Sequence, residues 1–96
     1  MAEKVVVTRH AALVDLLIER GIIDADVEVI SHATPEQVTG KDVVGVLPLS
    51  LASLANSVTE IPLALTPDMR GQELELETLR SIAGEAVTYK VQKVSD

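Results

Sequence analysis

Short runs of β-branched and aliphatic residues alternate with helix-forming segments along the whole chain, and this alternation constrains the fold more than any other feature. The periodicity predicts strands at Lys4–Thr8, Val27–Ile30, Val43–Leu47, Ile61–Leu65 and Val87–Val94. It predicts helices at Ala11–Arg20, Thr34–Gly40, Leu49–Val58 and Gly71–Ala86. Strands that alternate with helices imply a mainly parallel sheet with helices on both faces. We therefore expect an α/β fold, a single three-layer Rossmann-like domain over residues 1–96 with about five strands, whose strand order stays open.

Several of these segments carry signals at their boundaries. Gly21 follows the first predicted helix, where a glycine commonly ends a helix. Thr34 and Pro35 begin the second, because threonine caps helices and proline is tolerated in their first turn. Val87–Val94 alternates between apolar and polar residues, so we expect it to be an edge strand that could run antiparallel.

Composition and charge exclude some classes of partner. The chain has one tyrosine and no phenylalanine or tryptophan, so it lacks the aromatic side chains on which single-stranded nucleic acids usually stack. Its formal net charge is −7, which opposes the many phosphate contacts that binding of long nucleic acid requires. We therefore expect no long nucleic acid as a partner.

The absence of cysteine excludes disulfides and thiolate metal sites. The apolar runs are too short to span a bilayer, and Met1–Lys4 does not begin like a signal peptide. We expect a cytoplasmic protein that does not bind a membrane.

Polar side chains follow each of the first four predicted strands. Because ligands of parallel sheets bind outside the carboxyl ends of the strands, these residues are the candidate site. The candidates are Thr8, Arg9 and His10 after the first strand, Ser31 and His32 after the second, Pro48, Leu49 and Ser50 after the third, and Thr66 and Arg70 after the fourth. Both histidines of the chain belong to this group.

Two arginines in this group favour a phosphate ligand. The guanidinium groups of Arg9 and Arg70 suit phosphate oxygens, and the helices predicted after the first and third strands would direct free N–H groups to the same region. The alternative is that each arginine pairs with Asp68, Glu73 or a helix end.

The remaining candidates have structural alternatives. His10 and His32 could act as acid, base or hydrogen-bond donor, or could be inert loop residues, and a two-histidine metal site is less favoured. Ser31 and Ser50 lack the Gly-x-Ser-x-Gly turn of a nucleophile, so capping is the favoured role. Thr8 and Thr66 could likewise only cap. The chain has no Walker loop and no Gly-x-Gly-x-x-Gly fingerprint, so nucleoside triphosphates and dinucleotides are not expected.

Three segments together resemble the small CRISPR-associated Csx-sixteen family. They are Val7–His10, Gly45–Ala52 and Met69–Leu74, in that order along the chain. The combination of Thr-Arg-His after a strand, Leu-Pro before a small-residue helix and Arg-Gly-x-Glu-Leu at a helix start is more specific than any one of them.

The resemblance implies a ring nuclease of type III CRISPR systems, with a CARF-related fold and a homodimeric state. Its substrate would be cyclic oligoadenylate, especially cyclic tetra-adenylate, whose cleavage switches off CRISPR signalling. Such a ring carries its own nucleophile, a ribose 2′-hydroxyl that attacks the adjacent phosphorus in line, so no metal and no cofactor are expected. In this interpretation Arg9 and Arg70 hold phosphate charge, and His10 assists proton transfer, while the other candidates contact the ligand.

Two other functions remain open at this point. The same residues could capture the messenger as a sponge or sensor without breaking a bond. Alternatively, the chain could be an interaction subunit that docks on other CRISPR proteins through the acidic helix face that carries Glu73 and Glu77.

Overall fold

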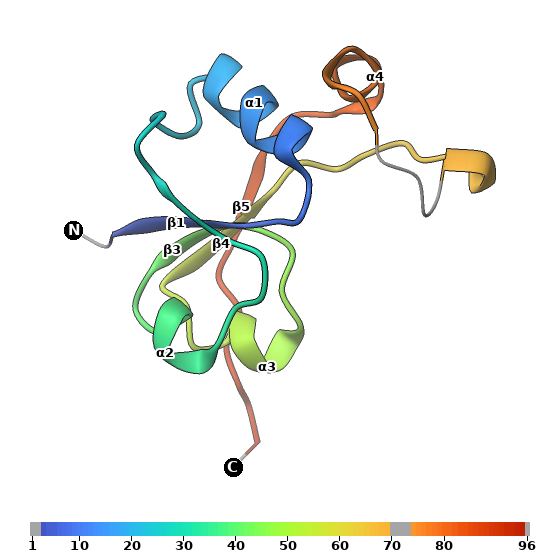
Figure 1. The fold of residues 1–96 in the computed structure, drawn as a ribbon. Helices are drawn as coiled ribbons and strands as arrows, with labels where there is room; N and C mark the ends of the chain where they lie inside the picture. Colours follow the sequence, from blue (N-terminus) through green and yellow to red (C-terminus); the bar gives the residue numbers. More distant parts are fainter. Residues whose placement is uncertain (1–2, 70–73, 96) are drawn as a thin grey trace.

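A five-stranded sheet forms the centre of the protein in the computed structural model, which describes residues 3–69 and 74–95 (Figure 1). Its strands are β1 (Lys4–Val7), β2 (Glu28–Ile30), β3 (Asp42–Gly45), β4 (Ser57–Glu60) and β5 (Val87–Tyr89). Their order across the sheet is β2-β1-β3-β4-β5. The neighbours from β2 to β4 are parallel, and β5 runs antiparallel to β4. The prediction of a mainly parallel sheet of about five strands is confirmed.

Helices cover both faces of this sheet. They are α1 (Ala11–Glu19), α2 (Pro35–Val38), α3 (Leu49–Ala52) and α4 (Leu76–Ile82), with a 3-10 turn η1 at Pro67–Met69. α1 and α4 lie side by side on one face, and α2 and α3 lie on the other (Figure 1). This three-layer arrangement confirms the predicted Rossmann-like fold. Within the described part of the chain, none of the helices has the length and apolar character needed to cross a membrane.

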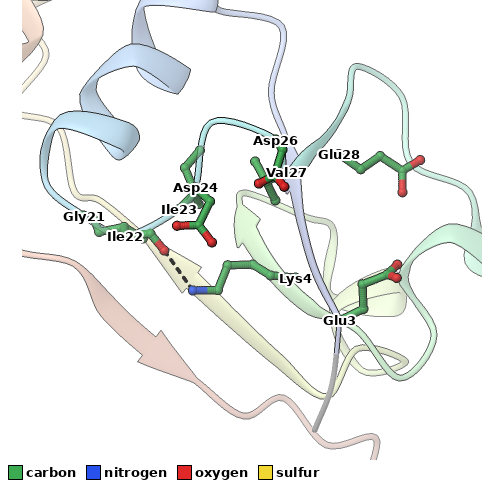
Figure 2. Close-up of a pocket in the computed structure, with 9 residues that line it drawn as sticks. All are labelled: Glu3, Lys4, Gly21, Ile22, Ile23, Asp24, Asp26, Val27 and Glu28. Atoms are coloured by element: carbon green, nitrogen blue, oxygen red, sulfur yellow. Dashed lines mark hydrogen bonds between the residues drawn. The ribbon is translucent and has the colours of Figure 1, made fainter.

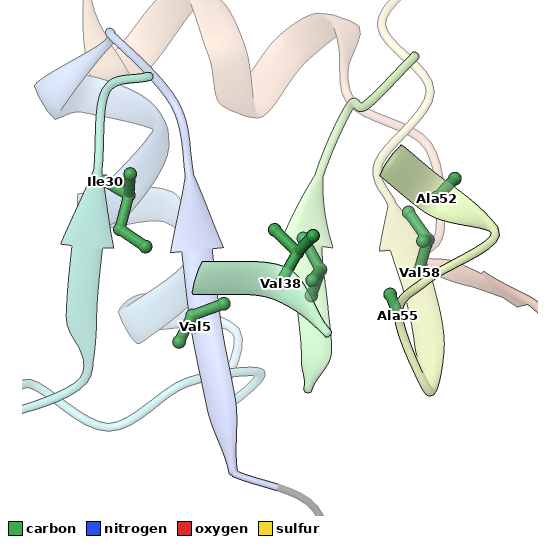
Figure 3. Close-up of a cluster of buried hydrophobic side chains, with 7 residues drawn as sticks. Val5, Ile30, Val38, Ala52, Ala55 and Val58 are labelled. Carbon is green, nitrogen blue, oxygen red and sulfur yellow. The ribbon is translucent and has the colours of Figure 1, made fainter. Parts of the chain in front are cut away.

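Alternation along the central strands divides the valines between two cores. Val5 and Val43 join a cluster of buried side chains on the α2 and α3 face, which Figure 3 shows. Val6 and Val44 point to the opposite face, where they pack with Leu17 of α1. Both central strands therefore bury side chains on both faces, as their apolar sequences predict.

The fourth strand and the helix before it differ from the prediction. β4 begins at Ser57, and the expected strand Ile61–Leu65 makes only one isolated bridge, from Leu63 to Ala83. α3 is a single turn, whereas the sequence predicted a helix over Leu49–Val58. The chain returns to the sheet early because the Asn56 N–H donates to the Lys41 carbonyl.

The C-terminal elements are shorter than predicted. α4 spans Leu76–Ile82, and the backbone of Ala83 after it is extended. The helix start expected at Gly71 lies outside the described residues. β5 ends at Tyr89, whereas the predicted strand continued to Val94. β5 is the edge of the sheet, and its tyrosine is half exposed.

Two arginines tie α4 to α1. Arg80 forms an ion pair with Glu19, and its hydrogen bonds lower the pKa of that carboxyl. Arg20 Nη1 donates to the Gly84 carbonyl at 2.6 Å. These exposed contacts join the helix after β4 to the helix after β1, and each contributes modestly to stability.

Gly45 allows the two central strands to meet closely at their carboxyl ends. Its φ is +139°, and a Cβ built on it would lie 2.2 Å from the Val7 carbonyl oxygen of the neighbouring strand. Any side chain would therefore have to push β1 and β3 apart.

Gly45→Ala should lower the free energy of unfolding by about 3 kcal/mol or more, because a strained backbone conformation adds to a steric clash. Urea denaturation would measure the loss. Gly40→Ala is the matched control, since Gly40 has φ +74° and no atom within 4 Å of a built Cβ. The control should lose only roughly 1–2 kcal/mol, and equal losses in the two variants would contradict the steric argument.

Asp42 joins the start of β3 to the start of β4. Its carboxylate accepts hydrogen bonds from Asn56 Nδ2 at 2.7 Å and from Ser57 Oγ at 2.8 Å. The bond from Asn56, followed by the bond from Ser57, holds the pKa of Asp42 below its usual value. A lowered folded-state pKa means that ionised Asp42 stabilises the fold above about pH 4, and that this stabilisation is lost as the pH falls through the lowered pKa.

Asp42→Asn should therefore reduce the free energy of unfolding more at about pH 6 than at about pH 3. Urea denaturation of both proteins at the two pH values measures the difference. Asp24→Asn is the control, because the Asp24 side chain makes no hydrogen bond to the described residues. A penalty for Asp42→Asn that is the same at both pH values would show that the ionised form of Asp42 does not stabilise the fold.

Candidate functional site

The strand order places a ligand crevice between β1 and β3. From β1 the chain crosses through α1 to β2 on one side, whereas β3 lies on the other side of β1. Loops leave the two carboxyl ends in opposite directions at such a point, and ligands of open parallel sheets bind there. A hollow of about 560 Å³ opens at this place. The site thus lies at the edge that the sequence predicted, at a position that depends on the strand order.

The hollow has a polar and an apolar group of lining residues. The polar residues are Thr8, Arg9, His10, Ser31 and His32. The apolar residues, apart from Gly45, are Val7, Leu13, Ala33, Val46, Leu47, Pro48, Leu51, Ile61 and Leu63. An apolar wall with a few convergent polar groups is typical of sites for small ligands.

Arg9 and His32 bring the loops after β1 and β2 into contact. Arg9 Nη2 lies 3.2 Å from Nδ1 and 3.1 Å from Nε2 of the His32 ring. Because one guanidinium nitrogen is almost equally close to both ring nitrogens, it lies against the ring and does not bond to one nitrogen alone. Within residues 3–69 and 74–95, Arg9 makes no salt bridge, so the alternative of a carboxylate partner is not found there.

His10 directly precedes α1 at the edge of the same hollow. Its backbone N–H donates to Thr8 Oγ1 at 3.1 Å, and its carbonyl accepts the N–H of Leu13 at 3.1 Å. Thr8 therefore shapes the turn into the helix, which was the structural alternative for this residue. The first turn of a helix has free N–H groups and favours anions, and α1 has nine residues.

Three of the predicted residues that the structure describes do not line this hollow. Leu49 and Ser50 belong to the single turn α3, which is too short to direct a helix dipole to a ligand as expected. Leu49 lines a neighbouring shallow hollow together with Val46 and Tyr89. Thr66 donates to the Asp68 carboxylate in a local turn and does not directly follow β4, so its predicted position was wrong. Arg70 lies outside the described residues, as does Glu73.

Apart from Pro48, the apolar lining was not among the sequence candidates. Leu13 fell within the predicted helix Ala11–Arg20, and Ile61 and Leu63 fell within the predicted strand Ile61–Leu65. Once β4 is placed at Ser57–Glu60, the apolar run that follows it becomes a loop at the carboxyl edge. An apolar run in a loop beside polar candidates is the signal that could have identified these residues.

A second hollow, of about 490 Å³, lies at the amino ends of β1 and β2 (Figure 2). Four carboxylates line it, from Glu3, Asp24, Asp26 and Glu28. Lys4, the one cation among the described lining residues, donates to the Ile22 carbonyl at 2.8 Å. Phosphate is therefore disfavoured at this end of the sheet. Among the described histidines and carboxylates, no three lie together as metal ligands.

The chain matches a known protein family. The family described as "Putative CRISPR-associated protein (Cas_VVA1548)" matches residues 5–92. No curated protein and no solved structure matches the chain. The matched range covers the five strands almost completely and includes all residues that line the carboxyl-end hollow. The chain therefore belongs to this family of CRISPR-associated proteins.

Proposed function

We propose that the protein is a ring nuclease that binds and cleaves cyclic oligoadenylate, with cyclic tetra-adenylate as the expected substrate. Membership of a CRISPR-associated family and the resemblance to the Csx-sixteen family support this activity. The observation that carries the proposal is the charge of the carboxyl-end hollow. Its described lining includes Arg9, His10 and His32 and no carboxylate, although the whole chain has a net charge of −7.

Local positive charge in an acidic chain favours a compact anion over a long one. A short phosphodiester ring can contact Arg9 while it stays clear of the surrounding carboxylates. A long RNA would also have to cross the acidic surface, including the end of the sheet that carries Glu3, Asp24, Asp26 and Glu28. Selectivity for a compact cyclic ligand follows from this repulsion.

Cleavage needs positioning and charge stabilisation more than a protein nucleophile. The ribose 2′-oxygen attacks the adjacent phosphorus, the bond to the 5′-oxygen breaks, and a 2′,3′-cyclic phosphate and a 5′-hydroxyl form. The 2′-hydroxyl loses one proton and the leaving 5′-oxygen gains one, so the step is balanced without a co-reactant. In this mechanism Arg9 stabilises the charge on the phosphoryl oxygens, and His10 transfers a proton.

A second copy of the chain would complete the site. A hollow of about 560 Å³ is the size expected for a ligand much smaller than a ring of four nucleotides. A homodimer with two-fold symmetry would present two hollows to one ring and double the cations that contact it. The homodimer is therefore part of the proposed function.

A sponge or sensor without catalysis is the second candidate. It is favoured by one observation: no hydrogen bond to a described residue fixes the ring of His10, which is exposed. A general acid or base that is not held in place could need the ligand to orient it, or could serve binding alone.

The proposal predicts that cyclic tetra-adenylate is converted to linear products in the presence of EDTA. Arg9→Ala should lower the rate about 100-fold or more, because it removes a charge-stabilising group, and His10→Ala should lower it by a similar factor. Products are resolved by chromatography. Arg80→Ala is the matched control, since Arg80 pairs with Glu19 and does not line the hollow.

Other outcomes would overturn specific parts of the proposal. An intact ring that co-elutes with the protein would indicate a sponge or sensor, and no binding at all would favour an interaction subunit. Activity lost on addition of EDTA would contradict the metal-independent mechanism. Cleavage of unstructured linear RNA at the same rate as the ring would contradict the selectivity argument.

A further inference from the structure

The contact between Arg9 and His32 joins a permanently charged side chain to one that becomes positively charged when it takes up a proton. Arginine has five N–H donors and no acceptor, and it stays charged at all relevant pH values. A neutral imidazole tolerates the guanidinium against its ring, because its ring nitrogens and π face attract a cation. A protonated imidazole has two donors and no acceptor, so the same contact would set two cations against each other.

We infer that His32 is a positioning residue for Arg9, and that binding of a phosphodiester is coupled to uptake of a proton by His32. The inference deepens the proposed function and rests on it for the identity of the ligand. Without an anion, neutral His32 holds Arg9 at 3.1–3.2 Å over the loop between β2 and α2. With an anion between them, both side chains donate to its oxygens, and the imidazolium becomes the favoured form.

The described groups that line the hollow around His32 include no carboxylate that could take up a proton in its place. The loops after β1 and β2 contribute Arg9 and His10 to the hollow as the other charged or titratable groups, and the described lining from β3, α3 and the segment after β4 contributes none. Asp15 lines a neighbouring hollow to which Thr8, Arg9 and His10 also contribute, and it is absent from the described lining around His32. With no carboxylate in the described lining, an arriving anion supplies the negative charge that stabilises the imidazolium.

This coupling fixes the direction of the pH dependence. A ligand that prefers protonated His32 raises the titration midpoint of that ring and binds more tightly as the pH falls through the range in which histidines titrate, about pH 5 to 8. If His32 had a purely structural role, its substitution would instead weaken binding equally at every pH.

The test uses a ring that cannot be cleaved. Cyclic tetra-deoxyadenylate lacks the 2′-hydroxyl, and its phosphodiesters do not titrate in this pH range, so any proton uptake belongs to the protein. The chain has two histidines, so NMR can follow each imidazole separately during a pH titration with and without the ring. The same titration with sulfate probes the anion site without adenine.

We expect the ring to raise the midpoint of His32 by about half a unit or more, which corresponds to about threefold tighter binding at low pH. His32→Gln keeps a hydrogen-bonding side chain without a titratable charge, so its affinity should vary less with pH than that of the wild type. Arg80→Gln is the control, because Arg80 pairs with Glu19 away from the hollow, and it should keep the wild-type affinity and pH dependence.

The outcomes separate this inference from the function on which it rests. If sulfate raises the His32 midpoint and the ring does not bind, the oligoadenylate function fails and the coupling stands. If the ring binds and the His32 midpoint does not move, or if His32→Gln keeps the wild-type pH dependence, the coupling is wrong. If neither anion moves the midpoint, the coupling is also wrong.

Discussion

The close approach of β1 and β3 at Val7 and Gly45 is the constraint on which the arrangement of the site depends. Gly45 has no side chain and adopts a positive φ, so the Val7 carbonyl can occupy the space that a Cβ would need. The two central strands therefore remain paired to their carboxyl ends, where their loops leave in opposite directions. The hollow, the contact between Arg9 and His32 and the start of α1 all lie around this point.

The sequence predicted the layers of the fold because those depend on local patterns. Val5 and Val6, like Val43 and Val44, point to opposite faces, and such runs identify central strands without knowledge of their neighbours. Thr34 caps α2 as its sequence indicates, with the capping box completed by Gln37. These signals span only a few residues each, so they can be interpreted from the local sequence without knowledge of which segments pair in the fold.

The fourth strand and part of the site could not be predicted because they depend on distant partners. Ile61–Leu65 is more apolar than Ser57–Glu60, yet hydrogen bonds to Asp42 and Lys41 bring the polar segment into the sheet. Because β4 ends at Glu60 and not at Leu65, Thr66 does not directly follow the strand as predicted. The candidates that do line one hollow lie within three residues of a strand end that the sequence placed to within two residues. They are Thr8, Arg9, His10, Ser31, His32 and Pro48. The strand order, which locates the hollow between β1 and β3, is a property of long-range pairing alone.

The position of the one aromatic residue has a consequence for how the protein can be observed. Tyr89 lies on the edge strand β5, opposite Val58, and the chain has no tryptophan or phenylalanine. Tyrosine emission and aromatic circular dichroism therefore report on the β4 and β5 edge, and the lining of the carboxyl-end hollow has no aromatic chromophore besides its two weakly absorbing imidazoles. Adenine absorbs ultraviolet light strongly, so an adenylate bound in that hollow would dominate the spectrum of its complex. Without such a ligand, the described lining contributes almost nothing to the near-ultraviolet spectrum, so binding of an adenylate could be followed directly by absorbance or circular dichroism.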